Sequence, residues 1–213
     1  MTNKGFLRAA AAALLLTGLT AGVSAQDQDD GGSQGGGGSQ ITISGGIALS
    51  TMSASVTSKG GQNATQPGVE GGVGVGGNIY LDYMLPVSIP LSLGVEIGFD
   101  KASVKDVNGS IGVAAIPLLV RAAYHFDLFP KFDLYLVGKL GGAVGTITNS
   151  PYVPSGFAFG IDVGAAYYFS SSVGVFAELG FDDYMLSVEY GPYNYTYNLP
   201  FYRFFTAGIS IKF

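Results

Sequence analysis

Apolar residues recur at every second position along most of this chain from residue 41 onward. The pattern is clearest in the segment 69–85, where the odd positions are apolar or Gly and the even positions include Glu70, Asn78 and Asp82. Side chains of a β-strand alternate between two faces, so this spacing predicts a long strand with one apolar face. The same period recurs in seven further segments, 41–49, 91–99, 113–126, 134–144, 157–167, 173–181 and 205–213. We therefore expect an all-β fold of eight strands.

The composition of the opposite face indicates what surrounds these strands. Charged residues make up only 12% of the chain, against about 25% in a typical soluble domain. The second face consists mostly of Gly, Ser and Ala, whereas a water-exposed face would carry many more Lys and Glu. We interpret the apolar face as lipid-facing and the small residues as the lining of a narrow interior, in preference to a soluble barrel. Because an open edge in lipid would leave backbone groups unpaired, we predict a closed, eight-stranded antiparallel up-and-down transmembrane β-barrel.

Several functional classes are disfavoured by composition. The formal charge of −5 argues against a nucleic-acid partner, which needs a basic face. The chain has no Cys, which excludes a disulfide scaffold and a thiolate metal site. The GVGVGG motif at 72–77 lies inside a predicted strand with no helix after it, so a dinucleotide site is rejected. We expect no cofactor and no metal.

The first 40 residues are predicted to precede the barrel. Residues 1–25 are typical of a cleaved signal peptide, with Lys4 and Arg8 before an apolar stretch that ends in Val-Ser-Ala. Residues 26–40 are interpreted as a flexible, acidic Gly/Ser-rich linker, and residues 41–213 as the barrel domain. The leader predicts export from the cytoplasm.

The predicted connections alternate strictly between short and long. We interpret the short ones as periplasmic turns and the long ones as outer loops. The short connections are 86–90, 127–132 and 170–172, and the long ones are 52–67, 101–110, 146–155 and 182–200. Aromatic residues cluster near both ends of the strands, as in the interfacial girdles of transmembrane barrels. They are Tyr83, Tyr124, Phe126, Tyr167 and Phe169 on the turn side, and Phe99, Phe157, Phe159, Phe181 and Phe201 on the other.

Three segments carry a resemblance to a known family. They are GFAFGIDVGAAYYFSSSVGVFAELGF at 156–181, IPLLVRAAYHF at 116–126, and the alternating C-terminal segment that ends in Phe. The chain resembles the small eight-stranded outer-membrane β-barrel proteins of Gram-negative-type bacteria, which include the OmpA-type barrel domain and OmpX/OmpW-like proteins. The resemblance implies a bacterial outer-membrane location, contact with outer-membrane lipid, and recognition by the barrel-assembly machinery. The expected assembly signal comprises Phe205, Ile209, Ile211 and Phe213.

Charged residues predicted to lie inside the barrel must pair, because an unpaired charge in a narrow interior is costly. We predict a lumen ion-pair network in which Arg121 and Lys139 pair with Glu96 and Glu178. Such a network is either a static structural core or a gate that rearranges, and the sequence leaves both interpretations open.

Evidence for catalysis is weak. The only His of the chain is His125, which lies beside a predicted periplasmic turn, and no spacing singles out a Ser or Asp partner. We therefore interpret His125 as an interface residue and expect a non-enzymatic protein.

The segment 182–200 is the most distinctive predicted surface. It is rich in tyrosine, which makes good contact surfaces at low entropic cost. Its tyrosines are Tyr184, Tyr190, Tyr193, Tyr195 and Tyr197. We expect a structural or adhesin-like surface-interaction role, with a host or phage surface as the candidate ligand. A loop that packs on itself or rests on lipid headgroups is the alternative interpretation. A narrow, porin-like OmpW-type channel for small solutes is the alternative function.

Overall fold

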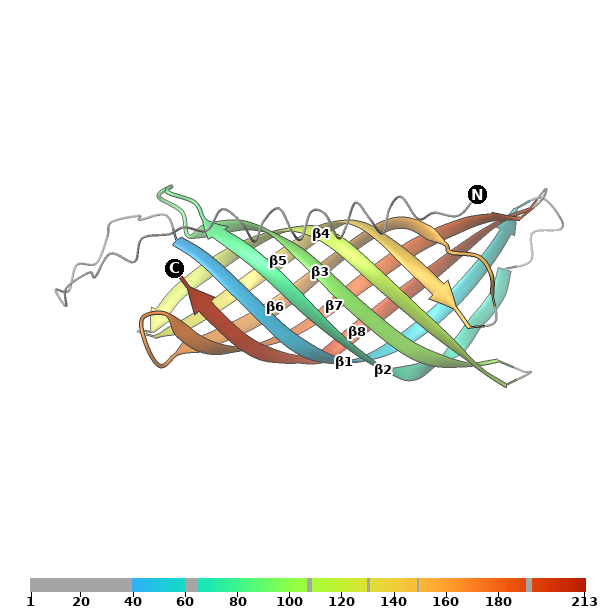
Figure 1. Ribbon diagram of the computed structural model, residues 1–213, viewed down its shortest axis with the longest axis horizontal. Helices are drawn as coiled ribbons and strands as arrows, with labels where there is room; N and C mark the ends of the chain where they lie inside the picture. Colours follow the sequence, from blue (N-terminus) through green and yellow to red (C-terminus); the bar gives the residue numbers. More distant parts are fainter. Residues whose placement is uncertain (1–39, 60–64, 107–108, 130, 149, 191–192) are drawn as a thin grey trace. The chain divides into compact units, whose positions relative to one another are not determined.

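Eight antiparallel strands close into one barrel in the computed structural model (Figure 1). The structure describes residues 40–59, 65–106, 109–129, 131–148, 150–190 and 193–213. Each strand pairs with the next along the chain, and β8 returns to pair with β1. The strands are β1 (Gln40–Lys59), β2 (Thr65–Met84), β3 (Leu91–Asp106), β4 (Gly109–Phe129), β5 (Phe132–Ile147), β6 (Ser155–Tyr168), β7 (Val173–Tyr190) and β8 (Tyr193–Lys212). The predicted fold class is confirmed.

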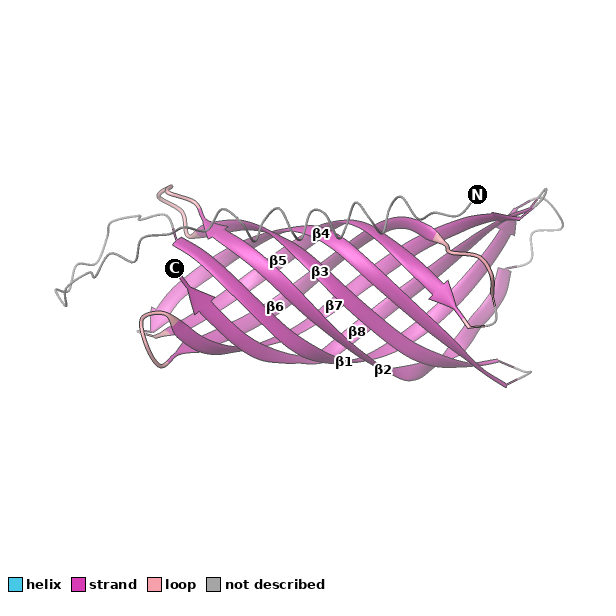
Figure 2. Ribbon diagram, viewed as in Figure 1, coloured by secondary structure: helices cyan, strands magenta, loops and turns pink. Residues whose placement is uncertain are grey.

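Strands and the connections between them account for the described residues up to Lys212, and none of the described residues is helical (Figure 2). No helix among them is long and apolar enough to cross a membrane. The predicted signal peptide and nearly all of the predicted linker lie outside the described residues. Gln40, which we assigned to the linker, instead begins β1 and pairs with Met84.

The predicted apolar face is the outer face of the barrel. Ile47 and Val73 each expose 72% of their surface, and Val120 exposes 60%. The alternating residues point inward and are buried, as Ala48, Ser50 and the interior charges are. Soluble proteins rarely expose so continuous an apolar surface to water, so the outer face fits a lipid environment.

We call the end of the barrel that carries the β2–β3, β4–β5 and β6–β7 connections the turn end, and the opposite end the hairpin end. At the turn end, the β4–β5 connection is tight enough to place Lys131 at a φ of 65°. At the hairpin end, three of the four predicted long loops are largely strand. β1 ends at Lys59 and β2 begins at Thr65. β3 ends at Asp106 and β4 begins at Gly109, and β7 ends at Tyr190 and β8 begins at Tyr193.

The physical reason for this difference is the loss of alternation beyond the apolar band. The outward residues of the β7–β8 hairpin include Ser187, Glu189 and Thr196, which are polar. Strands that leave the hydrocarbon no longer need an apolar outer face, so the periodic signal vanishes while the backbone pairing continues. The 146–155 connection is the one predicted long loop that stays largely irregular.

A β-bulge interrupts β8. Leu49 pairs with Phe205, whereas the next residue, Ser50, pairs with Arg203. Phe204 and Phe205 are therefore both exposed on the outer face. The residues that point inward have even numbers on the C-terminal side of the bulge and odd numbers on its N-terminal side. As a result, Phe201 is fully buried inside the barrel, and its predicted place in the outer aromatic girdle is wrong.

Candidate functional site: the barrel interior

The middle of the lumen contains a layer of buried charged side chains, which we call the ionic layer. Its basic members are Arg121, Lys139 and Arg203, of which none exposes more than 4% of its surface. Its acidic members are Asp82, Glu96, Asp100, Asp162, Glu178 and Asp182. Within the described residues, six carboxylates therefore face three basic groups. Close pairing of this kind is what makes buried charge tolerable.

Glu96 connects all three basic groups. Its Oε2 lies 3.1 Å from Nη1 of Arg121, and its Oε1 lies 3.8 Å from Nζ of Lys139 and 3.4 Å from Nη1 of Arg203. Asn78 donates a further hydrogen bond to Oε1 at 3.3 Å. A single carboxylate from β3 thus links β4, β5 and β8 across the lumen.

The structure brings together all four residues that we predicted as the ion-pair network. Nη2 of Arg121 lies 3.4 Å from Oε1 of Glu178, and Nε of Arg121 lies 3.1 Å from Oδ1 of Asp82. Lys139 pairs more closely with Asp162 and Asp182, at 2.6 and 2.7 Å, than with Glu96.

Two members of this layer, Asp182 and Arg203, were not predicted to lie in the lumen. Arg203 pairs with Asp100 at 2.7 Å and with Asp182 at 3.0 Å. Asp182 and Arg203 lie in and beside the segment that we predicted as a loop, so neither entered the predicted network. The alternation within FYRFF at 201–205 would have placed Arg203 inside the barrel, provided that a bulge at Phe204–Phe205 was taken into account.

An apolar cluster fills the lumen on the hairpin side of the ionic layer. Its largest members are fully or almost fully buried: Met52, Leu119, Tyr184, Leu186, Leu199 and Phe201. The rings of Tyr184 and Phe201 lie 5.3 Å apart. Together, the two layers leave the middle of the barrel packed with side chains.

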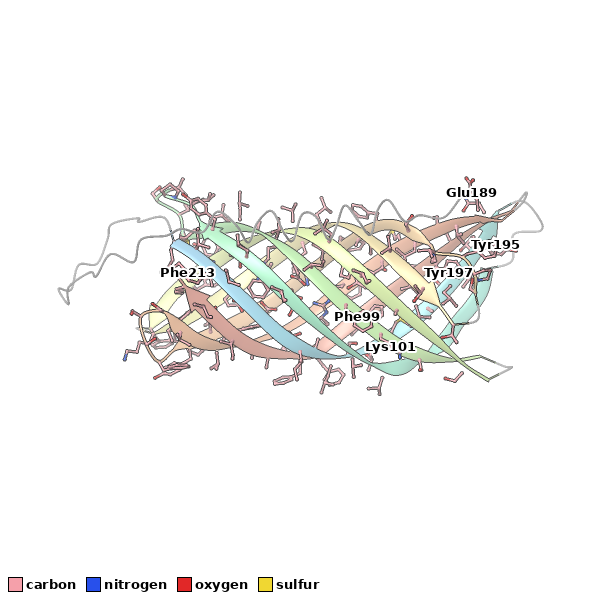
Figure 3. All side chains as sticks on the ribbon, viewed as in Figure 1. Phe99, Lys101, Glu189, Tyr195, Tyr197 and Phe213 are labelled. Atoms are coloured by element: carbon pink, nitrogen blue, oxygen red, sulfur yellow. The ribbon has the colours of Figure 1, made fainter. Side chains whose placement is uncertain are left out.

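The prediction that residues 182–200 form a tyrosine-rich outer loop is wrong, because most of this segment belongs to β7 and β8. Tyr184 is fully buried and donates a hydrogen bond inward, to Asp100, instead of presenting an outer surface. Tyr195 and Tyr197 lie on β8 at the hairpin end and are half-buried (Figure 3), and Tyr197 packs against the apolar cluster. Tyr190 and Tyr193 pair at the tip of the β7–β8 hairpin, and their side chains lie outside the described set. The tyrosines belong to strands because the 182–200 segment continues the barrel wall.

The turn end of the lumen is lined by polar side chains around a small cavity, which we call the vestibule. His125 points into it and is not an interface residue, since only 12% of its side chain is exposed. Tyr80 and Tyr135 form the inner boundary, where Tyr135 donates a hydrogen bond of 3.0 Å to Glu178. Among the residues that the structure describes, no group of three or more His, Cys, Asp or Glu side chains is arranged to hold a metal ion.

The residues of the predicted assembly signal share the outer face of β8. Phe205, Ile209 and Ile211 expose 45%, 58% and 38% of their surfaces, and Phe213 directly follows the strand. Their alternation with buried Thr206 and Ser210 matches the predicted register.

Comparisons with known proteins agree with this architecture. The model of the outer membrane protein beta-barrel domain family matches residues 11–213. No curated protein sequence matches significantly. Among solved structures, OprG from Pseudomonas aeruginosa is 15% identical with a TM-score of 0.57, and the match covers 84% of this chain and 98% of OprG. At this identity, the similarity shows a shared fold.

Two further solved structures are similar in outline. Neisserial surface protein A is 14% identical with a TM-score of 0.47, covering 78% of this chain and 97% of that protein. A major outer membrane protein from Thermus thermophilus is 14% identical with a TM-score of 0.48, covering 83% of this chain and all of that protein.

Proposed function

We propose that this chain, which belongs to the outer membrane protein beta-barrel domain family, acts as an occluded surface barrel with a structural or adhesin-like role. We take the turn end to face the periplasm and the hairpin end, where the strands continue beyond the apolar band, to face outward. A surface role then depends on the hairpin end, and a transport role depends on the lumen.

The filled lumen is the observation that carries the proposal. The ionic layer and the apolar cluster are stacked along the barrel, and their largest side chains are buried to 4% exposure or less. An eight-stranded barrel has little interior space beyond its own side chains. We expect liposomes that contain the purified barrel to exclude small sugars in a swelling assay, and swelling at the rate of a known porin would contradict the occluded state.

The hairpin end supplies a contact surface. The β7–β8 hairpin carries half-buried Tyr195 and Tyr197 at the hairpin end (Figure 3). Both lie on the face of the hairpin that continues the lumen lining, because Tyr197 pairs with the buried Leu186. A rigid strand pair presents aromatic groups at a lower entropic cost than a loop, because less freedom is lost on binding. The hairpin therefore suits contact with a host or phage surface.

Single substitutions test this role better than deletion of 186–198, which would remove the buried Leu186 from the barrel wall and break β8 beside the buried Leu199. We expect Tyr195→Ser to lower the adhesion of bacteria that display the barrel to cultured epithelial cells. Ser187→Ala, on the outer face of the same hairpin, is the matched control and should leave adhesion unchanged. If bacteria lacking the protein adhere as well as those displaying it, the adhesin-like role fails.

A narrow channel is the second candidate function. The excess of carboxylates over basic groups in the ionic layer favours it, since a negative constriction would attract cations if the side chains moved apart. Planar-bilayer recordings of the wild type and Lys139→Ala provide the test. A gate that rearranges predicts cation-selective events that increase in the variant, whereas silence in both proteins removes this candidate.

A further inference from the structure

We propose that Ser92, His125 and Asp133 form a hydrolytic site for short-chain acyl esters in the periplasm-facing vestibule. This activity goes beyond the proposed surface role and is independent of it. The three residues come from β3, β4 and β5 and meet inside the lumen, although Ser92 is 33 residues from His125 in the sequence. Oγ of Ser92 lies 2.9 Å from Nε2 of His125, and Nδ1 of His125 lies 2.9 Å from Oδ1 and 3.0 Å from Oδ2 of Asp133.

The partners of the two ring nitrogens decide where the imidazole proton lies. A carboxylate only accepts hydrogen bonds, so Nδ1 of His125 must carry the proton that it donates to Asp133. In the neutral imidazole Nε2 is then the unprotonated acceptor, and the Ser92 hydroxyl donates its hydrogen bond to it. This order of nucleophile, base and orienting acid is the one that serine hydrolases use, on unrelated folds.

The barrel wall holds the arrangement in place. Ser92 and Ala123 are cross-strand partners in the β3–β4 pair, and His125 is the cross-strand partner of Tyr135 in the β4–β5 pair. The ring centroids of His125 and Tyr135 lie 5.7 Å apart. Side chains mounted on neighbouring strands keep their spacing better than side chains on loops, as a catalytic geometry requires.

The size of the vestibule selects the class of substrate. Ser92, His125 and Asp133 line a cavity of about 30 Å³, and roughly 10–15 Å³ of such volume accommodates one water molecule. An acetyl group fills the space of two or three waters, so the enclosed part of the vestibule matches a short acyl group better than a fatty acyl chain. Gln40 and Lys212 line the same cavity, and each carries an N–H group that could donate to a developing oxyanion. Nζ of Lys212 lies 3.7 Å from the centroid of the Tyr168 ring.

The reaction needs only the ester and water. The Ser92 oxygen attacks the acyl carbonyl carbon as Nε2 of His125 takes the hydroxyl proton, and the same proton then passes to the departing alkoxide as the ester bond breaks. Water attacks the acyl-serine with His125 again as the base, which releases the carboxylic acid and restores the Ser92 hydroxyl. In this scheme Ser92 and His125 are catalytic, and Asp133 is a positioning residue.

Hydrolysis of p-nitrophenyl acetate and p-nitrophenyl octanoate by the purified full chain in detergent tests the proposal. We expect turnover of the acetate ester, with the octanoate ester at least tenfold slower. Ser92→Ala should reduce the rate to that of buffer, and Asp133→Asn should reduce it by about 100-fold or more. Ser50→Ala replaces another buried serine elsewhere in the lumen and should leave the rate unchanged.

Covalent labelling separates catalysis from a static hydrogen-bonded cluster. A fluorophosphonate probe should add once to the folded wild type, on the peptide that contains Ser92, and Asp133→Asn should slow the addition. If Ser92→Ala fails to fold, labelling of the wild type still shows whether Ser92 is a reactive nucleophile. Acetate hydrolysis that persists in a folded Ser92→Ala variant, or a folded wild type that takes no adduct at Ser92, overturns the proposal.

Discussion

Glu96 and Arg121 meet through Oε2 and Nη1 at 3.1 Å in the centre of the barrel, where Glu96 is fully buried and Arg121 exposes 1% of its surface. The contact is one of three that each residue makes within the ionic layer, since Glu96 also meets Lys139 and Arg203, and Arg121 also meets Asp82 and Glu178. The basic groups are outnumbered, so each of them neutralises several carboxylates. Loss of a basic group should therefore have a larger effect than loss of a carboxylate.

Lys139→Met and Glu96→Gln test this asymmetry. Lys139 is the only basic group within salt-bridge distance of Asp162 among the described residues, so Lys139→Met leaves a buried carboxylate unpaired. We expect the free energy of unfolding to fall by about 3–5 kcal/mol. Glu96→Gln keeps two carboxylates beside each basic group and should cost about 1–3 kcal/mol. Urea titration of the refolded barrels measures both values, and an equal or larger loss for Glu96→Gln would contradict the argument.

The inward glycines are predicted to be intolerant of any side chain where they face the ionic layer. A Cβ on Gly160 would overlap Oδ1 of Asp182 and lie 2.9 Å from Cε of Lys139. Gly160→Ala should therefore destabilise the barrel by about 1–3 kcal/mol. Gly138 is the matched control, because it is exposed on the outer face and a Cβ there meets nothing within 4 Å. Gly138→Ala should be neutral or slightly stabilising in the same unfolding assay.

The sequence predicted the membrane-embedded part of this fold well, because hydrocarbon forces every outward residue of that part to be apolar. Ile47, Val73 and Val120 carry that signal. The prediction failed where the constraint ends. Ser187 and Glu189 lie on paired strand but resemble a loop, because water accepts polar side chains on the outer face.

The ionic layer was predictable only in part for a different reason. Glu96 and Lys139 stand at inward positions of regular strands, so alternation alone placed them in the lumen. Arg203 precedes a bulge, which shifts by one residue the positions that point into the lumen. A bulge is defined by the pairing with the neighbouring strand, so no pattern within a single strand reveals it. The contact between Ser92 and His125 likewise depends on the register between two strands, which the alternation of each strand does not specify.

Lipid exposure of the outer face predicts a penalty for charge that depends on depth. Val120 lies in the apolar band and exposes 60% of its surface, so Val120→Arg should lower the free energy of unfolding in lipid by about 2–4 kcal/mol. Ser103 lies two residues beyond the exposed Lys101 toward the hairpin end (Figure 3). Ser103→Arg should cost no more than about 1 kcal/mol. Equal penalties at the two sites, measured by denaturant titration in liposomes, would argue against a bilayer boundary between them.

Removal of Phe213 tests the predicted assembly signal. If the barrel-assembly machinery recognises the C-terminal segment, deletion of Phe213 should lower the amount of folded barrel in the outer membrane of expressing cells. Folding of the purified chain into detergent should be unchanged, because this step requires no machinery. Phe204→Ala alters another exposed aromatic of the same strand and is the control. A deletion that impairs detergent folding as strongly as cellular assembly would assign Phe213 a role in stability instead.

The lumen should open only when both of its layers are reduced. Phe201 and Leu186 are fully buried in the apolar cluster, and Lys139 holds Asp162 and Asp182 together in the ionic layer. We expect Phe201→Ala with Leu186→Ala to remain silent in planar bilayers, because the ion pairs still block the path.

Addition of Lys139→Ala to this pair should produce cation-selective conductance, since the remaining carboxylates would line the constriction. Phe204→Ala, on the lipid-facing side of the same strand, replaces Phe201→Ala in the control combination and should stay silent. Conductance in the Phe201 and Leu186 double variant alone would mean that the apolar cluster, and not the ionic layer, closes the barrel.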